Sequence, residues 1–234
     1  MTGRWRTNPT NLLPLLCALY LILYLDRVNI ATAAPLIQGE MHLSNAALGV
    51  VLSAFAYTYA LCQLIGGLAG ERFGPRTTLS ASVVLVCIAT AATGFAGGMA
   101  GLIAARIALG LGEGAALPTA TQAMAKRLPQ ARWGFAQGIT HSFARLGNFA
   151  TPPIVVALIA VSSWRTAFFV LSTIGLLWII AWQLFFHDAP IDLLPPVRGK
   201  VARSAGRGGG TAMSRVLTKL GRQPYRRGPS KEGA

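Results

Sequence analysis

The sequence predicts an all-α membrane protein in which six transmembrane helices form one bundle. Of the 234 residues, 53% are hydrophobic and 12% are charged, whereas a soluble domain carries about 25% charged residues. The mean hydropathy of +0.51 also indicates a chain that lies mostly in lipid. A bilayer core requires about 20 predominantly apolar residues per helix. Six stretches satisfy this requirement: residues 12–34, 46–69, 77–96, 99–124, 134–158 and 166–186.

Short connectors that contain polar residues or glycine separate these stretches. In chain order they are Gln38–Asn45, Glu71–Arg76, Ala96–Gly98, Lys126–Arg132 and Ser162–Arg165. Lysine and arginine are retained on the cytoplasmic side of a membrane. The N-terminus and the second and fourth connectors each hold two or three of them, the first and third hold none, and the fifth holds only Arg165. This alternation predicts that both termini are cytoplasmic.

Composition divides the chain into a six-helix transmembrane domain, residues 1–187, and a basic segment, residues 188–234. The segment holds 10 of the 21 Lys and Arg residues, is rich in glycine and proline, and has no apolar stretch. Such a composition cannot bury enough surface to fold, so we expect a disordered cytoplasmic tail. Attraction to anionic lipid headgroups is one interpretation of it, and a segment without a function of its own is the other. The remaining basic residues form no stripe, so nucleic acid is not a predicted partner.

Signatures of enzymes and of metal sites are absent from the sequence. Cys17, Cys62 and Cys87 lie inside apolar stretches without a CxxC pair, and a buried free cysteine behaves as a small hydrophobic residue. Neither an HExxH nor a GxSxG motif occurs, and His141 and Ser142 are neighbours that point apart on one helix. We therefore expect no enzyme activity, no metal and no organic cofactor.

Four ionisable residues inside the apolar stretches are the first candidates for function, because burying them in a membrane is costly. Asp26 and Arg27 lie in the first stretch, and Arg106 and Glu113 lie in the fourth. At the rise of a helix, Asp26 lies about 14 Å, Arg106 about 10 Å and Glu113 about 21 Å from the outer end. Asp26, Arg27 and Arg106 are therefore expected at one level, with Glu113 deeper. Such a cluster can attract an anion and a proton, or it can be an ion-pair network that only locks two helices together.

The fourth and fifth stretches contain further residues with two interpretations each. His141 and Arg145 either line a path or serve as an interhelical donor and a cation that reaches the interface. Gly110, Gly112 and Gly114 form a GxGxG pattern, but no strand precedes it. Close helix packing is therefore predicted there instead of dinucleotide binding.

The segment from Gly67 to Arg76 resembles the signature loop of the major facilitator superfamily. Its glycine, acid, base, glycine and base occur at the family spacing, as Gly67, Glu71, Arg72, Gly74 and Arg76. The resemblance implies that the acid and bases bridge helices and help to hold the outward-open state. A tight turn with cytoplasmic anchors is the alternative.

Within that superfamily, four segments resemble the anion:cation symporter branch: residues 24–29, 53–63, 106–114 and 164–165. The branch moves organic anions such as sugar acids, usually together with protons in bacteria. The resemblance implies a set of substrate-binding residues: Arg27, Asn29, Tyr59 and Arg106. It implies that Asp26 and Glu113 carry the coupling proton.

The sequence departs from the family in its length. Such transporters have twelve helices in two halves with the site between them, and this sequence has one half followed by a basic segment that resembles a frameshift product. We expect the N-terminal half of a proton-coupled organic anion symporter in a bacterial inner membrane, working by alternating access with a second six-helix half or a second copy. The alternative is a truncated remnant or a membrane interaction subunit that does not transport.

Overall fold

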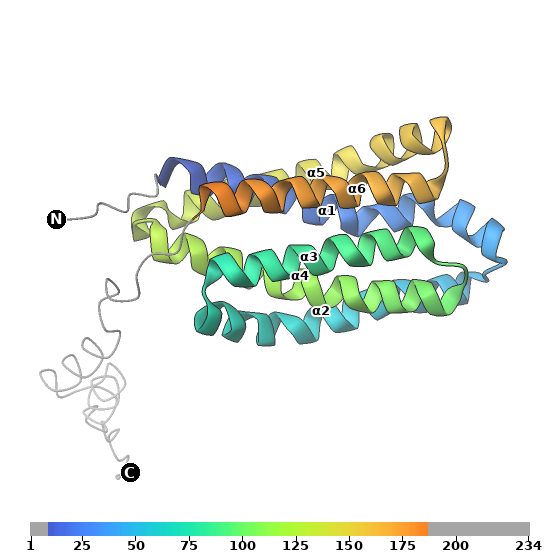
Figure 1. The fold of residues 1–234 in the computed structure, drawn as a ribbon, viewed down its shortest axis with the longest axis horizontal. Helices are drawn as coiled ribbons and strands as arrows, with labels where there is room; N and C mark the ends of the chain where they lie inside the picture. Colours follow the sequence, from blue (N-terminus) through green and yellow to red (C-terminus); the bar gives the residue numbers. More distant parts are fainter. Residues whose placement is uncertain (1–8, 187–234) are drawn as a thin grey trace, which may run out of the picture. The chain divides into compact units, whose positions relative to one another are not determined.

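The computed structural model describes residues 9–186, which form six α-helices and one short 3-10 turn (Figure 1). All six helices are long and apolar enough to cross a membrane, so the predicted fold class is confirmed. The basic segment 188–234 lies outside the described residues. The elements are α1 (Pro9–Met41), α2 (Asn45–Phe73), α3 (Pro75–Phe95), α4 (Met99–Arg127), η1 (Gln130–Arg132), α5 (Trp133–Val161) and α6 (Trp164–Phe185).

The first helix is longer than the sequence predicts, because it runs through Pro35 to Met41 instead of ending at residue 34. Neighbouring helices can satisfy the backbone groups that a proline frees in a membrane-length helix. The added turns are held at their end by Glu40, which accepts a hydrogen bond from Trp164 Nε1 at 2.5 Å and pairs with Arg165. Both partners lie at the start of α6, so this contact joins the end of α1 to the start of α6.

The helices pack as two groups of three, in which α1 contacts α5 and α6, and α4 contacts α2 and α3 (Figure 1). Contacts between α3 and α6 connect the two groups. Exchanging α1–α3 with α4–α6 maps the α2–α4 contact onto the α5–α1 contact and leaves the α3–α6 contact in place. This is the packing expected of two three-helix repeats that exchange one helix each. The start of α1 and the end of α6 lie at the same end of the bundle.

Glycines on α4 allow two neighbouring helices to approach it closely. A Cβ added at Gly110 would lie 2.9 Å from the backbone nitrogen of Tyr59, and one at Gly114 would lie 2.7 Å from the Tyr59 carbonyl oxygen. A Cβ at Gly112 would lie 2.9 Å from the carbonyl oxygen of Ser82 on α3. The predicted packing role of this GxGxG pattern is confirmed. The backbone of Tyr59 therefore lies against the turn of α4 that carries Glu113.

Candidate functional site

An ion pair between α1 and α4 forms the centre of the candidate site. Arg27 donates from Nε and Nη2 to Glu113 Oε2, at 3.1 and 2.6 Å. The Arg27 side chain is 23% exposed, whereas that of Glu113 is 0% exposed. Glu113 is therefore buried in the protein, whereas Arg27 remains accessible to a ligand.

Aromatic rings surround the guanidinium group of Arg27. Its Cζ lies 4.5 Å from the ring centroid of Tyr59, 4.7 Å from Tyr24 and 5.3 Å from Phe55. The rings of Phe55 and Tyr59 stack on each other at 5.5 Å. A cation over an aromatic face is stabilised by about 0.5–1 kcal/mol at an exposed site and by more when desolvated. These rings restrict the orientation of the guanidinium without neutralising its charge.

The pairing of Arg27 with Glu113 contradicts the depths expected from the sequence. Arg27 lies fourteen residues before Met41, and Glu113 lies fourteen residues after Met99. Both residues are therefore about 21 Å from the end of the bundle where α1 meets α2. The expectation that Glu113 lies deeper was wrong because the first helix was ended seven residues too early.

Asp26 and Arg106 lie on another side of the same helices and contact α3. Asp26 is 2% exposed and accepts hydrogen bonds from Thr90 Oγ1 at 3.1 Å and from Asn29 Nδ2 at 3.5 Å. Arg106 is also 2% exposed and donates from Nη2 to Thr93 Oγ1 at 3.3 Å. The sequence suggested that the four charged residues meet in one cavity, but in the structure they do not. Two form an ion pair beside a cavity, and two bind hydroxyl groups inside the bundle.

Three buried polar atoms of the predicted substrate-binding and proton-carrying residues have no hydrogen-bond partner within residues 9–186. They are Glu113 Oε1, Asn29 Oδ1 and Arg106 Nε. A buried polar atom without a partner is costly, so each marks a position where a water molecule or a ligand atom improves the hydrogen bonding, and Glu113 Oε1 can also bind a proton. The free oxygen of Glu113 is the one adjacent to the partly exposed arginine.

The predicted signature loop spans the junction of α2 and α3 and consists of Gly67, Glu71, Arg72, Gly74 and Arg76. Gly67 accepts a hydrogen bond from Gln122 on α4 at 2.7 Å, and Glu71 and Arg72 are exposed. Gly74 adopts a φ of 82°, in the left-handed region that glycine tolerates. Arg76 donates to the carbonyl oxygen of Gln183 on α6 at 2.8 Å. The loop therefore makes a tight turn and joins α3 to α6. Its gating role stays a prediction.

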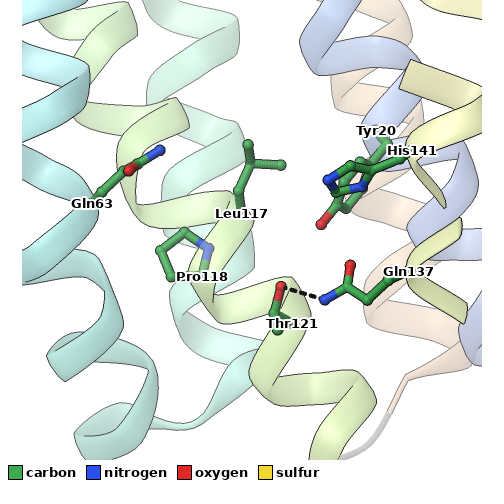
Figure 2. A pocket seen from close by; sticks show the side chains of 7 residues that line it. All are labelled: Tyr20, Gln63, Leu117, Pro118, Thr121, Gln137 and His141. Atoms are coloured by element: carbon green, nitrogen blue, oxygen red, sulfur yellow. Dashed lines mark hydrogen bonds between the residues drawn. The ribbon is translucent and has the colours of Figure 1, made fainter. Parts of the chain in front are cut away.

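A cavity of about 410 Å³ lies between α1, α2, α4 and α5. Figure 2 shows Gln63, Leu117, Pro118 and Thr121 on one side of it and Tyr20, Gln137 and His141 on the other. From the sequence, His141 is a candidate for lining such a path, whereas the other polar lining residues are not predicted. For two of them the sequence contains a signal, which is helical spacing. Tyr20 lies seven residues from Arg27, and Gln63 lies four residues from Tyr59. Arg145 is not among the described residues that line the cavity.

Known proteins with similar sequences are transporters. A model of the Major Facilitator Superfamily matches residues 16–226. A probable sulfoacetate transporter of Cupriavidus necator is 49% identical over 76% of this chain and 42% of its own length. A hexuronate transporter of Bacillus subtilis is 33% identical over 78% of this chain and 44% of its own length. The chain thus spans about half the length of the curated relatives it matches. Because the matched family consists of transporters, the prediction that the chain is not an enzyme is confirmed.

Solved structures of transporters show the same arrangement of helices. A bacterial homologue of the human lysosomal transporter Spinster superposes with a TM-score of 0.73 at 20% identity, over 87% of this chain and 48% of that protein. A proton:xylose symporter superposes with a TM-score of 0.68 at 18% identity, over 75% and 44% of the two chains. The exchanged three-helix groups, the six membrane-length helices and the matched family model together establish that this integral membrane protein belongs to the major facilitator superfamily.

Proposed function

We propose that this chain supplies six helices of a carrier that moves a small organic anion across a bacterial inner membrane, together with a proton and by alternating access. The observation that carries the proposal is a partly exposed Arg27 paired with a fully buried Glu113 beside a polar cavity. The names of similar proteins support the substrate class, since they are described as transporters of sulfoacetate, hexuronate and D-galactonate.

The carboxylate of the substrate competes with Glu113 for Arg27. The guanidinium has several donors in a planar fork, and Glu113 Oε2 accepts from two of its three nitrogens. A substrate carboxylate that approaches from the exposed edge gains charge-assisted hydrogen bonds, each of which contributes about 1.5–3 kcal/mol. Tyr59 then lies against the cation and beside the bound anion.

Proton coupling follows from the burial of Glu113. When a substrate anion neutralises Arg27, the carboxylate of Glu113 shares its cation in a place with no exposure to solvent. An unpaired buried charge is strongly disfavoured, so Glu113 takes up a proton as the anion binds, and Glu113 Oε1, which has no hydrogen-bond partner among the described residues, accepts it. Asp26, one residue away from Arg27 and also buried, is the second carboxylate assigned to this task.

The pairing of this chain with a second six-helix unit belongs to the same proposal. The outer side of α2 leaves several large apolar side chains uncovered: Tyr57, Leu61, Leu64, Leu68 and Phe73 are all at least 60% exposed. In the complete carrier, a second half or a second copy covers this surface of α2. The competing hypothesis, a remnant or interaction subunit that does not transport, requires no anion binding at all.

The test is equilibrium binding of radiolabelled D-galactonate to the purified chain in lipid nanodiscs. Arg27→Gln removes the cation with little change in size, and we expect affinity to fall by about 10-fold or more. Arg132→Gln is the matched control, because this exposed arginine lies in η1 and is not among the residues that line the cavity, and it should bind as the wild type does. Unchanged binding by Arg27→Gln contradicts the site assignment, and absence of binding by the wild type favours the remnant.

A further inference from the structure

We propose that the cavity between α1, α2, α4 and α5 is a second substrate-binding position, which holds the uncharged, hydroxylated end of an organic anion. Its polar lining consists of Tyr20, Gln63, Thr121, Gln137 and His141. This inference rests on the proposed function, because it requires that the carboxylate of the same molecule binds to Arg27. It adds a requirement for substrate length and for hydroxyl groups that the central ion pair alone does not impose.

The cavity continues the central site along the same helix faces. Residues four, seven or eight positions apart lie on one face of a helix. Three helices each contribute one residue to the centre and one to the cavity at such a spacing: Tyr59 and Gln63 on α2, Arg27 and Tyr20 on α1, and Glu113 and Thr121 on α4. The helical rise puts the cavity residues about 6–12 Å from the centre, toward the end where α1 begins.

The polar groups of the cavity suit hydroxyl groups, which donate and accept hydrogen bonds at once. Gln137 Nε2 donates to Thr121 Oγ1 at 3.0 Å, and this bond joins α5 to α4 across the cavity (Figure 2). The other atom of the same amide, Gln137 Oε1, is buried and has no hydrogen-bond partner in the described part of the chain. It is an acceptor held in position by its neighbour and ready for a hydroxyl donor.

The aromatic and apolar walls orient the remaining donors. The ring of His141 lies 5.3 Å from that of Tyr20 at an interplanar angle of 40°, so the two polar rings support each other on one side of the cavity (Figure 2). Leu117 and Pro118 provide an apolar surface on the opposite side. Among the described lining residues there is no Asp, Glu, Lys or Arg. The end of the substrate that enters here is therefore polar and uncharged.

The dimensions select for chain length. A volume of about 410 Å³ falls within the range of small-molecule sites, which is about 300–1,000 Å³. Carbon–carbon bonds of about 1.5 Å at tetrahedral angles extend a six-carbon acid about 6 Å beyond its carboxylate, and a two-carbon acid by less than about 2 Å. The six-carbon molecule reaches the near end of the cavity, where Gln63 lies about 6 Å from the centre, and the two-carbon molecule does not.

The experiment compares two hydroxylated acids of different length, D-galactonate with six carbons and glycolate with two, for binding to the purified full chain in nanodiscs. Gln137→Leu should weaken galactonate binding by about 5-fold or more, because it removes a positioned hydrogen-bond acceptor. His141→Phe keeps the ring and tests the same subsite without disturbing the α4–α5 hydrogen bond. Both variants should bind glycolate as the wild type does. Gln38→Leu is the matched control, since Gln38 bonds to Asn45 at 2.9 Å, outside the cavity lining.

The outcomes separate this inference from the proposed function. Equal effects of Gln137→Leu and His141→Phe on both acids, or no effect on either, overturn the second position and leave the Arg27 site intact. A wild type that binds glycolate as tightly as galactonate does the same. If Arg27→Gln leaves glycolate binding unchanged, or if the wild type binds neither acid, the proposed function fails and this inference fails with it.

Discussion

Two neighbouring ionisable residues on α1 lie in two different environments. Arg27 faces α2 and α4, is partly exposed, and is neutralised by the carboxylate of Glu113. Asp26 faces α3, is sealed, and is stabilised by the hydroxyl of Thr90. We call Arg27, Tyr59 and Glu113 the open side, and Asp26, Thr90, Thr93 and Arg106 the sealed side. A step of one residue rotates the side chain by about 100°, which is enough to separate the two environments.

The difference teaches which charge a ligand can influence directly. On the open side, charge compensates charge, and an incoming anion can replace the carboxylate without opening the bundle. On the sealed side, one hydroxyl group and one amide hold the carboxylate, and an exchange of partners requires the helices to move apart. An anion therefore binds directly on the open side. The residues of the sealed side are affected only through the change in charge or through helix movement. Three predictions test this division.

The largest effect is expected when the ion pair of the open side is broken. Glu113→Ala leaves a guanidinium without its carboxylate, and removing one partner of a buried pair costs about 3–5 kcal/mol. Because Arg27 is partly exposed, we expect the lower end of that range. The free energy of unfolding, measured by detergent titration of the purified chain, gives the value.

A double-mutant cycle provides the control for this prediction. Arg27→Ala combined with Glu113→Ala removes both charges, and the double variant should be more stable than the sum of the two single losses predicts. Pairs in contact show interaction energies of about 0.5–3 kcal/mol in such cycles. Strict additivity would show that the two residues do not stabilise the fold as a pair.

The next effect is the pH dependence of anion affinity, which shows whether the proton taken up on binding goes to the open or the sealed side. If Glu113 takes up a proton as the anion binds, raising the pH opposes binding, and affinity falls by up to about 10-fold per pH unit, or about 1.4 kcal/mol. Glu113→Gln is neutral at every pH, so its anion affinity should be independent of pH. Asp26→Asn should keep the pH dependence of anion binding seen in the wild type, because the proton assigned to Asp26 on the sealed side exchanges only when the helices move apart.

The measurement is galactonate binding in nanodiscs between pH 5 and 9 for the three proteins. A flat profile for Asp26→Asn and a sloped one for Glu113→Gln would transfer the proton to the sealed side. Flat profiles for both variants would mean that the two carboxylates act together.

The sequence predicts the helices well because their cause is local. Each span requires about 20 apolar residues, and the glycines of α4 already indicate close packing through their spacing and their apolar context. The charged residues are also visible in the sequence, since ionisable groups are rare in such stretches. These features depend on composition and period, which a single sequence contains in full.

The partners of those residues could not be predicted in the same way. The end of α1 depends on the contact of Glu40 with Trp164 and Arg165, more than 120 residues away, and that end determines the level of Arg27. The division between open and sealed sides depends on helix rotation, which no local pattern fixes. The cavity arises from four helices at once, so Gln137 and Thr121 looked like ordinary polar residues near a membrane surface.

The smallest effect concerns the aromatic rings that orient Arg27 on the open side. Tyr59→Leu removes the ring that lies 4.5 Å from the guanidinium carbon, a contact that contributes about 0.5–1 kcal/mol, so anion affinity should fall by about 2- to 5-fold. Tyr59→Phe keeps the ring and should bind as the wild type does. Tyr57→Leu is the matched control, because Tyr57 lies two residues away on α2 and is 78% exposed. Equal losses for Tyr59→Phe and Tyr59→Leu would mean that the hydroxyl of Tyr59, and not its ring, contributes to binding, and the open side would then hold the anion through a direct hydrogen bond from α2.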